Sequence, residues 1–206
     1  MDVKCYLERS IFECDPYWPP FVGCDDYAAA ATIACFRVAY GARFAFPFIA
    51  LLNIMSLYQV RPAVARDAAT IAAIHVNTWQ EAYEGLLPEA DLKAISVDKR
   101  LKLWREAIQY GDPQVHVAVD GDRIVGFVGF DRSRDPKSKP TTGEIWAIYV
   151  GPGDWDQGAG LALWDAAREG LVEEGCTEVT LWVMLKNERA LRFFELAGFK
   201  RELNTA

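Results

Sequence analysis

The stretch from Gly143 to Gly160, GEIWAIYVGPGDWDQGAG, constrains what this chain can fold into more than any other. Its first part, residues 144–150, is rich in aromatic and β-branched residues and therefore favours a strand. Residues 151–153 break that strand, and Gly158-Ala159-Gly160 precedes a helical pattern. Because glycine lets main-chain N–H groups approach a bulky anion, and a helix start favours negative charge, we expect a phosphate-bearing ligand at this turn. The plainer alternative is an ordinary tight turn.

Two familiar nucleotide-binding loops do not fit the spacing of this turn. The dinucleotide fingerprint needs a third small residue where Leu163 stands, and a strand–helix–strand unit, whereas three expected strands come first here. The P-loop needs a Gly-Lys-Ser/Thr triplet, which the turn lacks. Neither loop therefore explains the glycines.

Composition bounds the class of protein. The chain has 206 residues, of which 51% are hydrophobic and 25% charged, and this predicts a globular protein with a sizeable core. The net charge of −7 argues against nucleic-acid binding, because no basic stripe exists to neutralise phosphates. The five cysteines form no Cys-x-x-Cys pair and there are two histidines, so we expect no metal site. Disulfides among the four cysteines that precede residue 36 stay open as an alternative.

Residues 1–57 differ in character from the rest, and we expect them to be an atypical extension before a domain at 58–206. The apolar run at 44–58 is too short for a membrane-spanning helix, and lengthening it takes in Arg43, so a membrane protein is not expected. The run also starts too far along the chain for a signal peptide, and we expect a cytoplasmic protein. An alternative is that Met55 is the native start.

Two helical patterns lie in the first half of the domain. From Asp67 onward, apolar residues recur at three- and four-residue spacing, and His75, Trp79 and Tyr83 share one helix face. One interpretation of this stripe is core packing with the histidine hydrogen-bonded, and the other is an aromatic wall beside an acceptor pocket. The second helical region follows, with Ser96 as its expected cap.

Alternation and turn residues predict the remaining elements. Besides the strand at 144–150, four strands are expected, over residues 56–61, 115–119, 123–130 and 177–183. The helix that begins at the glycine turn is expected to run to about Glu174. Asn187 is expected to cap a last helix that Gly198 ends, before a final strand.

Two motifs stand out in this order of elements. One is the strand end Ile148-Tyr149-Val150 followed by Gln157-Gly158-Ala159-Gly160, and the other is Asn187-x-x-Ala190-x-x-Phe193-Phe194-Glu195-x-x-Gly198-Phe199. They resemble the acetyl-CoA pyrophosphate loop and the C-terminal motif of the GNAT superfamily of acyl-CoA-dependent N-acetyltransferases. The resemblance covers about residues 58–206. It implies an α+β fold in three layers (αβα), with helices flanking a mixed, mostly antiparallel twisted sheet.

The resemblance implies roles for these positions in binding acetyl-CoA. Main-chain N–H groups of the turn and helix start would hold the pyrophosphate; they belong to Trp155, Gln157, Gly158, Ala159, Gly160 and Leu161. Ile148 and Val150 would pair with the pantetheine arm through their backbones, and an N–H near Tyr149 or Val150 would polarise the thioester carbonyl. Asn187 would hydrogen-bond the arm, a role that its sequence position does not separate from a simple helix cap.

Three features depart from the family pattern. Trp155 stands where the family usually has Gln or Arg, but backbone amides are expected to preserve CoA binding. Phe194, in the cofactor site, replaces the tyrosine that protonates the departing thiolate. A thiol pKa of about 8.5 makes this loss tolerable, and Tyr149 is a candidate substitute. The chain also ends early relative to the family, so we expect the sheet to lack its last strand.

The expected reaction is direct transfer of acetyl from acetyl-CoA to a primary amine of a small molecule or peptide. Glu144 is the candidate general base, although a solvated carboxylate at a strand end explains it equally well. A second hypothesis is a non-catalytic CoA-binding or regulatory module, and a third is a partly degenerate reading frame. The acceptor does not follow from the fold, and a homodimer is one expected state because many relatives dimerise.

Overall fold

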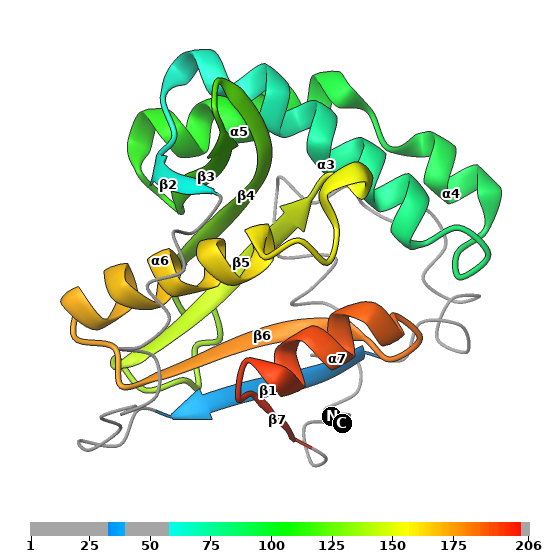
Figure 1. Ribbon diagram of the computed structural model, residues 1–206. Coiled ribbons are helices and arrows are strands. Elements are labelled where there is room, and N and C mark those ends of the chain that lie inside the picture. Colours follow the sequence, from blue (N-terminus) through cyan, green and yellow to red (C-terminus); the bar gives the residue numbers. More distant parts are fainter. Residues whose placement is uncertain (1–32, 40–57, 203–206) are drawn as a thin grey trace.

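The computed structural model describes residues 33–39 and 58–202, which form a mixed sheet with helices on both faces (Figure 1). The strands of the sheet are β1 (Ile33–Ala39), β2 (Gln59–Pro62), β3 (Gln114–Asp120), β4 (Arg123–Arg132), β5 (Thr142–Val150), β6 (Glu178–Met184) and β7 (Lys200–Glu202). The helices are α3 (Ala68–Ala82), α4 (Glu89–Ala94), α5 (Val97–Tyr110), α6 (Ala159–Glu173) and α7 (Glu188–Leu196), with short 3-10 turns at η2 (Ala65–Asp67) and η3 (Pro152–Asp154).

The helices form one layer on each face of the sheet. On one face, α6 and α7 close over a cluster in which Val128, Leu163 and Leu181 are almost inaccessible to solvent. On the other face, α3 and α5 pack over the central strands through a second cluster around Ile71 and Trp104. Each such side chain contributes about 1.5–3 kcal/mol by leaving water. The predicted three-layer αβα architecture is confirmed.

Capping residues in the sequence correctly predicted the starts of two helices. Ser96 and Asn187 each accept a hydrogen bond from the main-chain N–H three residues on, at 3.4 and 3.1 Å, as N-caps do. Asp67 stands at the start of α3 but does not cap it. Its carboxylate accepts from the Val64 N–H at 2.9 Å and pairs with Arg61 at 2.6 Å, which ties β2 to the turn before α3.

The strand order is β2-β3-β4-β5-β6-β1-β7, and β5 and β6 are the parallel pair in this otherwise antiparallel sheet. These two strands pair only over residues 142–144 and 178–180. Beyond that point they diverge, as the fanning of β5 and β6 in Figure 1 shows. The mixed, mostly antiparallel sheet is therefore as predicted, with an interruption in its hydrogen bonding near the centre.

A strand from the N-terminal segment covers the outer edge of β6, which we did not expect. β1 lies between β6 and β7, antiparallel to both, and pairs with β6 along its whole length. Phe36 is wholly buried, and Arg37 pairs with Glu178 at 3.3 Å and with Glu202 at 2.7 Å. We expected a sheet short of one strand, and β1 instead gives β6 a full-length partner.

The rest of the N-terminal segment lies outside the described residues, including positions 44–57 of the apolar run weighed as a membrane span. Within the described ranges, no helix is long and apolar enough to cross a membrane. Cys35 and Cys176 are both buried free thiols, so the alternative of a disulfide at Cys35 is wrong.

Candidate functional site

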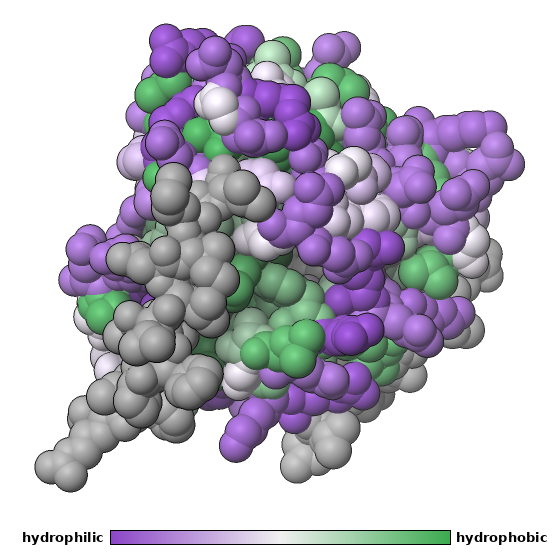
Figure 2. All heavy atoms as spheres, viewed as in Figure 1, coloured by the Kyte–Doolittle hydropathy of each residue, from purple (hydrophilic) through white to green (hydrophobic). Residues whose placement is uncertain are grey.

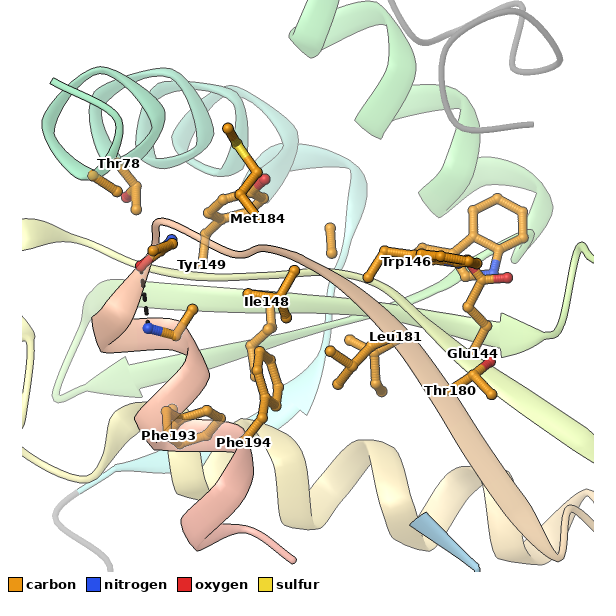
Figure 3. Close-up of a pocket in the computed structure, with 18 of the residues that line it drawn as sticks. Thr78, Glu144, Trp146, Ile148, Tyr149, Thr180, Leu181, Met184, Phe193 and Phe194 are labelled. Atoms are coloured by element: carbon orange, nitrogen blue, oxygen red, sulfur yellow. Dashed lines mark hydrogen bonds between the residues drawn. The ribbon is translucent and has the colours of Figure 1, made fainter. Parts of the chain in front are cut away.

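The divergence of β5 from β6 opens a cleft in the middle of the sheet. Ile148 of β5, Leu181 of β6 and Phe193 of α7 line it, and Figure 3 shows these side chains between the two strands and α7. Glu144 and Thr180 lie at the closed end, where the strands still pair. On the molecular surface, apolar side chains gather between α6 and α7 within a polar surround (Figure 2).

Helix α6 begins at the mouth of this cleft without a side-chain cap. Its N-cap, Gly158, has φ of 95°, a left-handed conformation that favours glycine. The first intrahelical hydrogen bond returns to the Gly158 carbonyl at 3.1 Å. The N–H groups of Ala159, Gly160 and Leu161 therefore point out of the helix start, where the dipole favours an anion. A Cβ at Gly160 would lie 3.3 Å from the Phe193 ring, a tight contact that would require the ring to shift slightly.

The main chain at the end of β5 points alternately toward β4 and into the cleft. The Gly151 N–H donates to a β4 carbonyl at 2.8 Å, whereas the Val150 carbonyl accepts from two side chains outside β4. The N–H and C=O of one strand residue point to the same side, and successive residues alternate. The N–H groups of Ile148 and Val150 therefore face the cleft, and that of Tyr149 faces β4. Of the two candidates for polarising a thioester carbonyl, the geometry favours Val150.

Trp155 and an arginine of α7 cover the glycine turn. The Trp155 indole N–H donates to the Val150 carbonyl at 2.7 Å, and the Thr78 hydroxyl donates to the same oxygen at 3.1 Å. The Arg189 guanidinium lies 4.1 Å from the centroid of the Trp155 ring and pairs with Asp156 at 2.8 Å. Trp155 thus folds back on its own strand, and a cationic group reaches the turn from α7.

The other predicted cofactor residues lie around the same cleft. The Gln157 amide donates to the Gly153 carbonyl at 2.9 Å, which leaves its main chain for a ligand. Asn187 uses its side-chain oxygen to cap α7. Phe194 is buried, with ring centroids 5.0 Å from Phe193 and 5.5 Å from Phe199, so it contributes an apolar wall.

Glu144 is buried, with 3% of its surface exposed, and both of its carboxylate oxygens have partners. The Arg134 guanidinium pairs with one oxygen, and the Arg134 main-chain N–H donates to the other at 3.0 Å. The same guanidinium lies 4.2 Å from the Trp146 ring centroid. The alternative of a solvated strand-end carboxylate is therefore wrong. A general-base role requires an amine or a water to compete with Arg134 for one oxygen.

The aromatic stripe of α3 divides between the core and the cleft. His75 is wholly buried, its Nδ1 accepts from the Trp104 indole at 3.0 Å, and the Tyr149 ring stacks on it with centroids 4.6 Å apart. Burial holds the pKa of His75 well below its usual range, so the imidazole is neutral at neutral pH. Of the two interpretations of the stripe, core packing is therefore the correct one for His75. Trp79 and Tyr83 line the cleft, and their contact with an acceptor stays a prediction.

Three residues of this site were not singled out from sequence. Thr78 fixes the end of β5, Arg134 neutralises Glu144, and Arg189 brings charge to the turn. Thr78 and the carbonyl that it binds are 72 residues apart, a contact that local pattern does not predict. Arg189 carried a weak signal, because it lies in the first turn of the helix that Asn187 was expected to cap.

A splayed sheet whose cleft leads to an uncapped helix start defines a fold of the acetyltransferase class. The chain belongs to the acetyltransferase (GNAT) family, whose profile matches residues 75–199. The resemblance inferred from the two motifs is confirmed.

Relatives and solved structures agree with this membership. An uncharacterized N-acetyltransferase of Bacillus subtilis, YuaI, is 30% identical over 157 residues, which cover 70% of this chain and 88% of the relative. A mycothiol acetyltransferase of Kocuria rhizophila is 30% identical over 151 residues, 69% of this chain and 46% of that longer protein. The crystal structure of PaiA N-acetyltransferase from Thermoplasma acidophilum in complex with coenzyme A shares the fold, with a TM-score of 0.61 at 20% identity over 70% of this chain and 91% of that one.

Proposed function

We propose that the protein transfers an acetyl group from acetyl-CoA to a primary amine by direct attack. One observation carries the proposal: the free N–H groups at the start of α6 and the inward-facing N–H groups of β5 border one continuous cleft. A ligand that carries both an anionic group and an arm with amide groups matches this arrangement. The anionic group would meet the helix start, and the amides would meet the strand. The pyrophosphate would lie at Ala159, Gly160 and Leu161, and the pantetheine arm would follow Ile148 and Val150 as an added strand. The CoA complex of the PaiA neighbour supports the choice of ligand.

The chemistry assigned to this chain is deprotonation of the amine and stabilisation of the carbonyl oxygen. An ordinary amine with a pKa of about 10.4 costs about 4.6 kcal/mol to deprotonate at pH 7. Glu144, at the closed end of the cleft, is the proposed base, acting directly or through water. The Val150 N–H is the proposed donor to the thioester oxygen as negative charge develops there. Tyr149, whose ring packs on His75, stays a candidate for protonating the departing thiolate in place of Phe194.

The acceptor class is the least determined part of the proposal. Similarity to a mycothiol acetyltransferase favours small-molecule amines as the first acceptors to assay. Peptide N-termini, polyamines and aminoglycosides complete the panel, because the fold alone does not choose among them.

Calorimetric titration with acetyl-CoA, combined with release of free thiol across the amine panel, tests the proposal. We expect binding and acceptor-dependent thiol release. Binding without release on any amine would favour the second candidate, a non-catalytic CoA-binding module. Two observations motivate that candidate: Phe194 carries no hydroxyl, and Arg134 occupies both oxygens of Glu144. Absence of binding would refute both.

A further inference from the structure

Glu144 meets an acceptor amine only if Arg134 gives up one of its carboxylate oxygens. The Arg134 guanidinium pairs with Oε1, and the Arg134 main-chain N–H donates to Oε2 at 3.0 Å. The main-chain bond ties the carboxylate to the loop between β4 and β5, whereas the side-chain bond can be given up to a competing cation. An ammonium that binds Oε1 therefore separates the guanidinium from its carboxylate, which is costly unless another anion replaces it.

Contacts that do not involve Glu144 hold Arg134 in place. Its guanidinium lies 4.2 Å from the centroid of the Trp146 ring, a cation–π contact. The loop that carries it is closed by the Ser133 N–H, which donates to the Thr142 carbonyl at 2.9 Å. The Arg134 side chain is 39% exposed and lines the cleft, so a ligand can reach it. After the exchange at Oε1, the guanidinium stays nearby as a cation that needs a partner.

Trp146 brings a second hydrogen-bond donor to the same place. It is the extra residue of a β-bulge, because β4 pairs with Ile145 and next with Ala147. Ile145 packs in the cluster shared with α6, so Glu144 and Trp146 on either side of it point to the other face. Figure 3 shows both side chains near the closed end of the cleft. The Trp146 Nε1 is buried and has no hydrogen-bond partner among the described residues, which favours a ligand oxygen there.

We infer that the acceptor is a zwitterion, an amine with a carboxylate close to it, as in an α-amino acid. The inference rests on the proposed function, because it needs Glu144 to receive the amine. The acceptor ammonium binds Oε1 of Glu144, and the acceptor carboxylate takes the Arg134 guanidinium, with the Trp146 indole N–H as a further donor. Each charge keeps a partner of opposite sign, and the net charge of the site does not change. A simple amine leaves Arg134 without an anion.

The exchange also prepares the reaction. The ammonium gives one proton to Glu144, which releases it to solvent, and the neutral amine attacks the carbonyl carbon of acetyl-CoA. The C–S bond breaks with its electron pair kept by sulfur, and the extra proton of the new amide passes to the thiolate. Arg134 touches none of the reacting atoms, and it acts by binding the acceptor and freeing Oε1.

A diamine is the rival class of acceptor. Oε2 of Glu106, on the α5 wall of the cleft, is buried and lacks a hydrogen-bond partner within the ranges that the structure describes. A second ammonium would pair with it. A diamine, however, removes the carboxylate from Arg134 and supplies no anion in its place, whereas a zwitterion satisfies both Arg134 and the Trp146 donor.

Acceptors that differ only in the carboxylate test the inference on the full chain. The common α-amino acids are assayed for thiol release, each beside its amide and its decarboxylated amine, which is the diamine cadaverine for lysine. With acetyl-CoA saturating, we expect kcat/KM of the preferred amino acid to exceed that of its two partners roughly 10-fold or more, the effect of a hydrogen bond to a charged group. The amide also stands for a peptide N-terminus, which lacks the neighbouring carboxylate.

Two variants and a control assign this preference to residues. Arg134→Gln should lower the ratio of amino acid to decarboxylated amine roughly 10- to 100-fold. Trp146→Phe, which keeps a ring beside the guanidinium and removes the N–H, should lower it roughly 10-fold. Arg105→Gln makes the same charge change at an exposed position of α5 that does not line the cleft, and it should keep the ratio. In calorimetry, the amino acid should bind the CoA-saturated chain roughly 10-fold or more weakly after Arg134→Gln.

The outcomes separate this inference from the function on which it rests. Thiol release with simple amines but no preference for any amino acid, or a preference for cadaverine over lysine, would overturn the inference and leave the proposed function standing. An equal loss for both members of a pair in Arg134→Gln would also overturn it, because Arg134 would then only support the fold. If no amine of any class releases thiol, the proposed function fails, and the inference fails with it.

Discussion

Replacing Phe36 by alanine tests whether the N-terminal strand β1 is part of the folded domain. The Phe36 side chain is wholly inaccessible to solvent and belongs to the cluster shared with α6 and α7. The Arg201 guanidinium of β7 lies 5.6 Å from its ring centroid. Truncating a buried phenylalanine costs about 3–5 kcal/mol, the sum of lost burial and of the cavity that remains. At roughly 2–4 °C per kcal/mol for a domain of this size, Tm should fall by roughly 6–20 °C.

Urea unfolding of the full chain, followed by tryptophan fluorescence, measures this loss directly. The midpoint should fall with little change in the denaturant slope. Leu196→Ala is the matched control, because this leucine is 80% exposed on α7 and its truncation should change stability by less than about 0.5 kcal/mol. If the domain proper began near Met55, the two variants would behave alike. A loss below about 0.5 kcal/mol for Phe36→Ala would refute the placement of β1.

Three further predictions concern the site and its support. Glu144→Gln should lower turnover at neutral pH roughly 100-fold or more while CoA affinity in calorimetry holds, and equal turnover across the pH range would remove Glu144 from the mechanism. Arg189→Gln should weaken CoA binding about 10-fold or more but leave binding of pantetheine, which lacks the pyrophosphate, unchanged; equal losses for both ligands would contradict the charge role. His75 has a lowered pKa in the fold, so below about pH 6.5 the unfolded chain binds a proton that the folded chain does not, and stability falls. His75→Gln should therefore flatten the fall of unfolding free energy between pH 6.5 and 5 by up to about 1.4 kcal/mol per pH unit, and an unchanged slope would show that His75 titrates normally.

Features set by local chain geometry were predictable from sequence. The left-handed conformation of Gly158 before α6 and the Asn187 cap of α7 depend only on residues within one helical turn. The local sequence was therefore enough to predict both features. The burial of His75 was one of two interpretations, because a helical stripe shows which residues share a face but not what covers that face.

Features set by contacts between distant segments were not predictable in the same way. β1 pairs with β6, and the Arg37 side chain of β1 donates to Glu178 across a separation of 141 residues. The composition of β1 matched an apolar extension as well as a strand. The ion pair of Glu144 with Arg134 depends on how a polar loop folds back on β5, and it decided against the solvated carboxylate. The local pattern of one sequence does not show which distant segments pair with each other.

The same distant contacts explain why the cleft stays open between two strands of one sheet. Main-chain N–H and C=O groups along both edges of a strand need partners. β6 pairs along its whole outer edge with β1, whereas its inner edge meets β5 only over residues 178–180. β5 is held from the other layer, because Thr78 of α3 binds the Val150 carbonyl. Since separate elements hold the two walls, the opening does not depend on a bound ligand, and an amide-bearing ligand can complete the ladder without first forcing the strands apart.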